Sequence, residues 1–347
     1  MASAVTRISC DKSHPGSLPH RRPSTLSNLG IDTSEEPSSS STHVEQPLKN
    51  PIQSILHPDV LVVSNLTDDE IKYLTGHSKN EFNVIFDFVL SEHINVVWPY
   101  QSLPLKEQLL MTLMKYRLNY DFIFLGTVFK ISHKAVSTVF RHWTHLLYGA
   151  FSTVNFWKTR AKAEELYTVI LDCTEIAIEK PTLPEKQQAT WSSYKNCNTF
   201  KGLVGIDEAG TVIFVSDLFG GAASDDVIVA RSSVLDLLAE GDYILADRGF
   251  EATDALAEKG IILNKPPKKK GEQMSEEDVA RTRALASRRV NVERIIGLVK
   301  KNRILTQKVP HHLFDVISRI FRLLFMLVNI KPSICQSIDP ICKCKKN

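Results

Sequence analysis

The sequence predicts a mixed α/β domain that follows an all-α region. Apolar residues recur at helical intervals between residues 61 and 150, and short β-rich runs begin at Tyr167. Helices and strands then alternate as far as a long basic helix from about Glu276 to Arg303, which is typical of a mixed sheet with helices on both faces. With 347 residues, of which 43% are hydrophobic and 23% charged, the chain is long enough for more than one globular domain.

Residues 1–60 lack the apolar periodicity of the later segments. They contain the run Ser38–Ser41, several prolines and almost no aromatic side chains, so we expect a disordered N-terminal arm. No secretory signal pattern opens the chain, and charged residues interrupt the most apolar C-terminal stretch, LFDVISRIFRLLFMLVNI. We therefore expect a soluble intracellular protein without a membrane partner.

The region 61–150 is expected to be helical and to contain a helix-turn-helix at about 103–147. Three helical segments, LKEQLLMTLMKYRL, DFIFLGTVF and SHKAVSTVFRHWTHLL, are separated by turns of two or three residues. In a DNA-binding helix-turn-helix the last helix enters the major groove, which would bring Lys134 to DNA and place Arg141 near the backbone. The same spacing is also found in helical modules that only pack, so both interpretations stay open.

The segment 165–332 carries the α/β pattern. The runs YTVILD, TFKGLVGI and TVIFVSDLF predict three strands, the last two joined as a hairpin. A helix over DDVIVARSSVLDLLAE, a strand DYILAD, a short helix ATDALAEKG and a strand IILN precede the long helix. This succession is similar to that of the ribonuclease-H-like fold.

A basic tail, 333–347, follows that domain and holds three of the six cysteines. The cysteines lack paired C-x-x-C spacing, which indicates reduced thiols and gives little support to a tetrahedral zinc site.

Three acidic residues are the candidate catalytic and metal-binding groups. Asp172 and Asp247 each follow an apolar strand, and Glu293 lies within the long helix. Singly, each has an ordinary structural explanation: a strand cap, a turn residue, and one half of an ion pair with Arg289. Together, two strand-end aspartates and one helical glutamate predict a site for Mg²⁺ or Mn²⁺, of the kind that cleaves phosphodiesters with two metal ions.

Positive charge is concentrated near the third acid. The net charge of the chain is +3, yet residues 265–303 hold twelve Lys or Arg against five Asp or Glu, which indicates a polyanionic partner such as DNA. A solvated charged helix is the plainer explanation. We expect Glu175 and Asp225 to support the metal ligands or to serve as spare ligands. The candidate phosphate contacts are Lys134, Arg141, Lys195, Lys201, Arg289, Lys300 and Arg303.

Five stretches of the sequence, spread over about two thirds of the chain, resemble segments of one protein family. LDCTEI, WSSYKNCNTFKGLVGI, FGGAASDD, ADRGF and NVERIIGLVKKNRIL resemble the DDE-superfamily endonuclease domain of Harbinger-type and related insertion-sequence transposases, with its preceding helix-turn-helix. The resemblance implies a ribonuclease-H-like core whose metal-binding acids are Asp172, Asp247 and Glu293. Many such transposases begin with a zinc finger, and residues 1–60 contain no complete zinc-finger pattern. Recognition of transposon ends then requires a separate DNA-binding partner, or the chain is an immobile copy.

The resulting prediction is a transposase-derived, divalent-metal-dependent DNA endonuclease or strand-transfer enzyme. The alternative is a domesticated DNA-binding or scaffold protein that keeps the fold without catalysis. Self-association is compatible with either function. The KPPKKK stretch, Lys265 with Lys268 to Lys270, resembles a nuclear-import signal, so we expect a nuclear location, although such runs are often only solvated loops.

Overall fold

The computed structural model describes residues 61–93, 98, 100–157, 166–247, 250, 253–265 and 276–332. These residues belong to one compact unit. The predicted disordered arm, the lysines Lys268 to Lys270 and the cysteine-containing tail lie outside the described residues, so those predictions are not tested. The division of the chain into domains likewise stays a prediction.

The helical region begins with two helices that carry the expected capping boxes. The Thr67 hydroxyl accepts a hydrogen bond from the Glu70 backbone, and the Glu70 carboxylate accepts one from the Thr67 backbone. Ser78 and Glu81 repeat this arrangement. Each box satisfies backbone donors that a helix start leaves free. The elements are η2 (Val63–Asn65), α1 (Asp68–Thr75) and α2 (Lys79–Glu92).

The predicted helix-turn-helix is present as three consecutive helices. Asp121 and Ser132 cap the second and third helices, each accepting a hydrogen bond from the backbone three residues on. Asn119 and Lys130, both at φ 54°, reverse the chain between helices in the left-handed conformation. The helices are α3 (Leu105–Leu118), α4 (Phe122–Phe129) and α5 (His133–Thr153).

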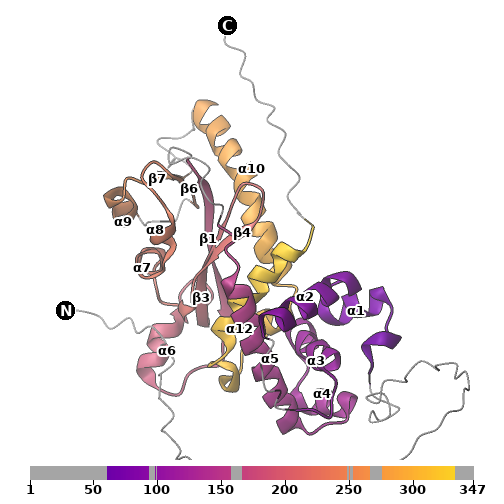
Figure 1. Cartoon of the computed structure of the whole chain (residues 1–347). Helices are drawn as coiled ribbons and strands as arrows, with labels where there is room; N and C mark the ends of the chain where they lie inside the picture. The colour runs from indigo at the N-terminus through magenta and orange to yellow at the C-terminus, as the bar shows by residue number, and fades with distance from the viewer. Residues whose placement is uncertain are drawn as a thin grey trace, which may run out of the picture. The chain divides into compact units, whose positions relative to one another are not determined.

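A mixed sheet forms the centre of the α/β part (Figure 1). Its strands are arranged in the order β2-β3-β1-β6-β7, with β4 and β5 also paired to β3. β1 is antiparallel to β3 and parallel to β6, and β6 is parallel to β7. The strands are β1 (Thr168–Ala177), β2 (Trp191–Ser192), β3 (Cys197–Ile206), β4 (Val212–Val215), β5 (Phe219–Gly220), β6 (Tyr243–Leu245) and β7 (Ile262–Asn264).

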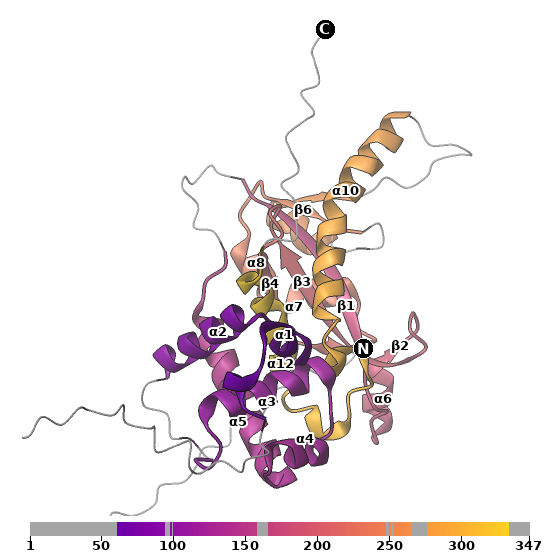
Figure 2. The same cartoon turned by 90° about the vertical axis from the view of Figure 1, so that its right-hand side faces the viewer.

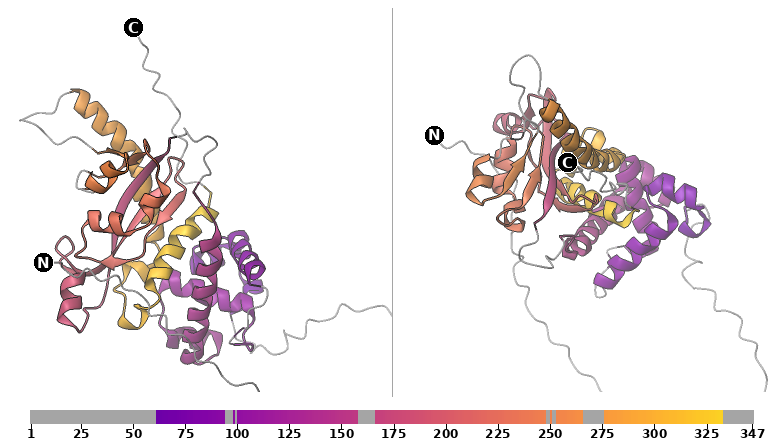
Figure 3. Two further views of the ribbon diagram at one scale, coloured as in Figure 1. Left: turned by 60° about the vertical axis from the view of Figure 1, so that its left-hand side comes forward. Right: turned by 90° about the horizontal axis from the view of Figure 1, so that it is seen from above.

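Helices cover both faces of this sheet (Figures 1 and 3). On one face, α7, α8 and α9 bury an apolar cluster that includes Leu171, Leu203 and Ile228. On the other face α10 lies along β1 (Figure 2), and α12 packs between the sheet and α5. The helices are α6 (Pro184–Thr190), α7 (Asp225–Arg231), α8 (Val234–Leu237), α9 (Thr253–Glu258), α10 (Glu276–Val299), α11 (Arg303–Thr306) and α12 (Ile317–Met326), with η3 (His311–Leu313) and η4 (Leu327–Ile330).

This order of strands and helices is the predicted ribonuclease-H-like α/β core, preceded by the predicted all-α region. Three details differ from expectation. The strand expected over TVIFVSDLF is divided into β4 and β5. The single helix expected after Ser224 is broken into α7 and α8, because Ser232 is extended and its hydroxyl donates to the Val229 carbonyl. The long helix ends at Val299, and Arg303 begins the separate α11.

Candidate active site

Asp172 lies on β1 and Asp247 lies just beyond the end of the neighbouring strand β6, at matching positions. The parallel pairing of β1 with β6 ends where Ile170 faces Leu245, and each aspartate follows two residues later. Asp172 was expected at the end of its strand, which is wrong, because β1 continues to Ala177 as the antiparallel partner of β3. Only the pairing with β6 ends near Asp172. The site therefore forms beyond the carboxyl end of β6, as is general for α/β sheets.

A buried carboxylate holds the two strands in this register. Asp242 is fully buried and directly precedes β6. It accepts hydrogen bonds from the backbone of Tyr167, just before β1, at 2.9 Å and from that of Ala239 at 2.8 Å. Hydrogen bonding of this kind compensates the desolvation of a buried acid. Asp242 thus fixes the start of β6 against the start of β1 and, through the strands, the positions of the two aspartates.

The third acid comes from α10, on the side of the sheet that Asp172 faces. The predicted apolar stripe is buried, with Val292 and Ile295 at 0% and 1% exposure, so it docks the helix and turns Glu293 outward. One turn earlier, the Arg289 side chain reaches two of the acids. Its Nη1 is 3.1 Å from Asp247 Oδ1, and its Nη2 is 3.6 Å from Glu293 Oε1.

The electrostatics of Asp172 reflect this crowding of acids. Burial raises the pKa of Asp172 to about 6, the Arg289 guanidinium opposes the rise, and the charges of Glu293 and Asp247 add to it. The Asp247 and Glu293 side chains are 62% and 58% exposed, whereas that of Arg289 is 13% exposed. A largely buried arginine therefore supplies positive charge to all three predicted acids.

Three carboxylates form a donor set that suits a hard divalent cation such as Mg²⁺ or Mn²⁺. As the side chains stand, no three His, Cys, Asp or Glu residues in the described part of the chain are grouped closely enough to hold a metal ion. The Arg289 guanidinium lies between two of the candidate ligands instead. The residues fit a cation by their chemistry, and its binding requires Arg289 to leave Asp247 and Glu293.

Glu175 and Asp225, expected to support the ligands, are directed to the other face of the sheet. Successive side chains of a strand alternate between faces, so Glu175 and Asp172 on β1 point in opposite directions. Glu175 accepts a hydrogen bond from Thr199 at 2.8 Å. Asp225 forms an ion pair with Lys201 at 2.6 Å. The structure therefore does not bring Glu175, Asp225 or Lys201 to the three acids.

Two of the predicted phosphate contacts lie nearer to the acids. Burial lowers the pKa of Lys300, the positive charge of Lys195 lowers it further, and the charges of Asp172 and Glu175 raise it, so Lys300 lies within electrostatic range of all three side chains. Lys195 is exposed and its Nζ lies 4.8 Å from the centre of the Tyr194 ring. Arg303 is also exposed, beyond the end of α10. Binding of DNA by these side chains stays a prediction.

The helix-turn-helix presents one of its two predicted contacts to solvent. Lys134 is exposed in the first turn of α5. Arg141 instead binds Asp315 and the His312 carbonyl, so it links α5 to the segment before α12. The Arg141 guanidinium therefore holds the helical region to the α/β part, and its proposed place near the DNA backbone is not supported by these contacts.

Two exposed aromatic side chains near Lys195 in sequence were not among the predicted site residues. Trp191 is 47% and Tyr194 82% exposed, on β2 and the turn after it. Large exposed rings can stack on unpaired bases. The sequence signal for this site is the run WSSYKN, which places aromatic and basic residues together. In the structure this run forms a tight turn, with Asn196 at φ 52°.

None of the described helices combines the length and the apolar character needed to cross a membrane.

Comparison with known families gives two matches. Residues 171–329 match the model of the DDE superfamily endonuclease. Residues 101–153 match the helix-turn-helix of DDE superfamily endonuclease. No curated protein matches the chain. The first match begins one residue before Asp172, and it includes Asp247 and Glu293.

Proposed function

We propose, from the premise that this chain contains a DDE superfamily endonuclease domain preceded by the helix-turn-helix of that superfamily, that it is a divalent-metal-dependent DNA endonuclease of transposase type. The observation that carries the proposal is the convergence of three acids from β1, the end of β6 and α10 around a single guanidinium. Acids that share one cationic partner are arranged so that a metal cation can replace it.

In this function Asp172, Asp247 and Glu293 would hold Mg²⁺ or Mn²⁺. A divalent cation bound there supplies activation of the attacking hydroxyl and stabilisation of the leaving oxygen during phosphodiester cleavage. Asp172 and Asp247 extend from adjacent strands, so the sheet fixes their separation before any ligand binds. Arg289 would swing from the acids toward the DNA, where a phosphate can accept its bidentate hydrogen bonds.

The neighbouring side chains would position the substrate strand. Lys195 and Lys300 lie on the side of Asp172 and would contact DNA phosphates, which raises affinity without reading sequence. Trp191 and Tyr194 would stack on bases that the reaction leaves unpaired. The exposed Lys134, at the start of α5, would add a further DNA contact from the helix-turn-helix.

One observation favours the alternative, a protein that binds DNA without cleaving it. Carboxylates grouped without a cation repel one another, so a protein without metal-dependent catalysis would be expected to lose them. Arg289 relieves the repulsion between Asp247 and Glu293 within the protein itself. The acids can therefore be retained for structural reasons, as part of an ion-pair network.

Metal binding separates the two functions. We expect Mn²⁺ to raise the melting temperature of the wild-type protein and Asp247→Asn to remove that rise, because a ligand that binds only the folded state stabilises it. Asp236→Asn is the matched control, since Asp236 lies on α8 and faces Lys259 at 3.8 Å. Equal rises in the wild type and Asp247→Asn would contradict a metal site at these acids.

Location and partners are proposals as well. Nuclear accumulation would depend on Lys268 to Lys270, and unchanged nuclear fluorescence after their replacement by alanine would exclude that segment as the signal. Recognition of a specific DNA end would fall to a second copy of the chain or to a separate DNA-binding partner. Light scattering of the purified protein, alone and with DNA, measures its molar mass and so shows directly whether two copies associate.

A further inference from the structure

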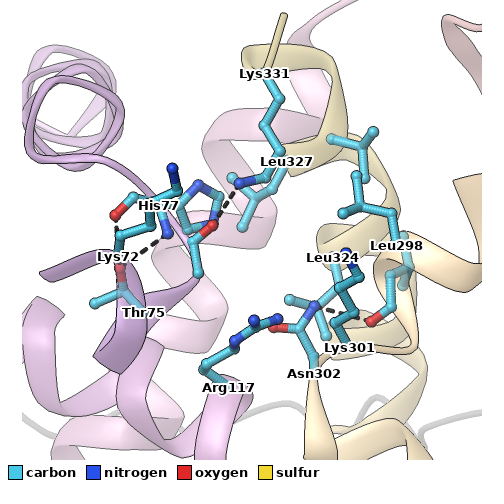
Figure 4. Close-up of a pocket in the computed structure, with 13 residues that line it drawn as sticks. Lys72, Thr75, His77, Arg117, Leu298, Lys301, Asn302, Leu324, Leu327 and Lys331 are labelled. Carbon is cyan, nitrogen blue, oxygen red and sulfur yellow. Dashed lines mark hydrogen bonds between the residues drawn. The ribbon is translucent and has the colours of Figure 1, made fainter. Parts of the chain in front are cut away.

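A basic cavity lies away from the three acids, where the helical region meets the α/β part. Its volume is about 190 Å³, and it is lined by residues of α1, α3, the end of α10, α12 and η4 (Figure 4). Lys72 and Arg117 reach it from the N-terminal helices, and Lys301 and Lys331 from the C-terminal segments. No acidic side chain is among its lining residues. We call this site the basic pocket.

The positive charge of the basic pocket is incompletely balanced. Lys331 Nζ lies 3.4 Å from Glu81 Oε2 and donates a hydrogen bond to the Gly76 carbonyl. In the described part of the chain no carboxylate lies within 4.0 Å of the Lys72, Arg117 or Lys301 side-chain nitrogens. Four cations with one acidic partner leave a net charge of about +3 around the cavity.

The surroundings make this charge costly. Leucines 298, 324 and 327 form an apolar wall (Figure 4), and apolar surroundings strengthen the interactions between charges. Burial lowers the pKa of Lys331, Glu81 opposes this change, and the charges of Arg117 and Lys72 lower the pKa further. Burial and the charge of Arg303 lower the pKa of Arg117 in the same way. Each of these cations would be stabilised by an anion in the cavity.

We propose that the basic pocket binds a phosphate group. Donors reach the cavity from several directions, and they include a guanidinium, whose planar fork matches phosphate oxygens. Water can fill the cavity but adds no negative charge to balance these cations. A cavity of about 190 Å³ accommodates a phosphate with an attached sugar or a second phosphate.

Two sources can supply that phosphate: the backbone of bound DNA or a free phosphorylated small molecule. Lys72 and Lys301 are exposed, so the cavity opens to solvent and admits either. In both cases the ligand would tie α1 and α3 to the turn that follows α10, the helix that carries Glu293. The inference goes beyond the proposed nuclease activity, and phosphate binding here requires no metal ion.

The test is a titration of the full-length protein with pyrophosphate, at constant ionic strength and with EDTA, read as thermal stabilisation. We expect saturable stabilisation of the wild type. The double variant Lys72→Gln/Lys301→Gln should weaken the apparent affinity at least tenfold, and these exposed side chains can be changed without loss of folding. Lys106→Gln/Lys259→Gln removes the same charge elsewhere and should bind as the wild type does. Arg117→Gln is a second, independent variant in the pocket.

Competition with duplex DNA identifies the source. If pyrophosphate displaces DNA from the wild type but not from the double variant, the pocket holds a DNA phosphate. If the protein binds both together, the pocket serves a free phosphorylated molecule. Equal stabilisation of the wild type and both pocket variants, or none in the wild type, would overturn the proposal. Because EDTA is present, neither of these results bears on metal-dependent cleavage.

Discussion

Replacing Arg289 by glutamine should make the protein bind Mn²⁺ more tightly. The guanidinium lies 3.1 Å from Asp247 Oδ1 and 3.6 Å from Glu293 Oε1, and a cation has to displace both contacts. The arginine side chain is only 13% exposed, while its two partners are more than half exposed. Solvent therefore screens both ion pairs in part. We place the free energy of each pair at the upper end of the range for surface ion pairs, because the arginine is largely buried.

The size of the effect follows from these contacts. Exposed ion pairs contribute about 0.2–1 kcal/mol each, so two good pairs amount to about 2 kcal/mol. A change of about 2 kcal/mol corresponds to roughly 30-fold in Kd. Arg288→Gln is the matched control, because Arg288, the neighbour of Arg289 on the same helix, contacts Glu208 at 3.3 Å and none of the three acids.

Calorimetric titration with Mn²⁺ measures both variants against the wild type. We expect Arg289→Gln to bind about 30-fold more tightly and Arg288→Gln to bind like the wild type. If Arg289→Gln binds Mn²⁺ no more tightly than the wild type, Arg289 does not occupy the place of the cation. The reasoning from its two ion pairs would then be wrong.

Four further predictions concern single residues. Glu293→Gln should abolish cleavage and leave DNA affinity equal or higher, since it removes a negative charge beside a polyanion; cleavage at the wild-type rate would exclude Glu293 as a ligand. Gly202→Ala should destabilise the fold by about 1–3 kcal/mol, because the new Cβ would lie 2.6 Å from Phe321 Cε1. Gly297→Ala meets nothing within 4 Å and should stabilise α10 by about 0.5–1 kcal/mol, and urea unfolding that ranks the two variants otherwise would contradict the packing described here. The His77 ring, whose Nδ1 lies 3.5 Å from Glu81 Oε2, lowers the pKa of Glu81 from 4.5 to about 2, so Glu81 adds stability above pH 4.5 that is lost as the pH falls toward about 2; a stability difference between the wild type and Glu81→Gln that does not change over this range would contradict the assignment.

Local signals in the sequence predicted most of the elements. The capping pairs at Thr67 and Ser78 mark the starts of α1 and α2, and apolar spacing predicted α3 from Leu105 to Leu118 as the structure has it. The hairpin between β3 and β4 was predicted from the turn residues that end at Gly210, which has φ 83°. These features depend on neighbours in sequence, so the sequence displays them directly.

Features that depend on distant contacts were harder to predict. The length of β1 beyond Asp172 is set by its pairing with β3, thirty residues away in sequence. Lys201 was predicted to contact DNA, and its ion pair with Asp225, at the start of α7, joins two residues from separate elements. The three acids were predicted from their motifs, and their role as metal ligands stays a prediction. The arginine that joins two of them was readable only as a neighbour of Glu293, because its contact with Asp247 spans 42 residues.

The central claim is that Asp172, Asp247 and Glu293 form a metal-dependent nuclease site. Cleavage of supercoiled plasmid with Mn²⁺ or Mg²⁺ tests it most directly, by comparing the wild type with Asp172→Ala and with the surface control Asp236→Ala. We predict that the wild type and the control nick the plasmid only when the metal is present, and that Asp172→Ala does not. Absence of cleavage by the wild type with either metal, or equal cleavage by Asp172→Ala, would contradict the claim.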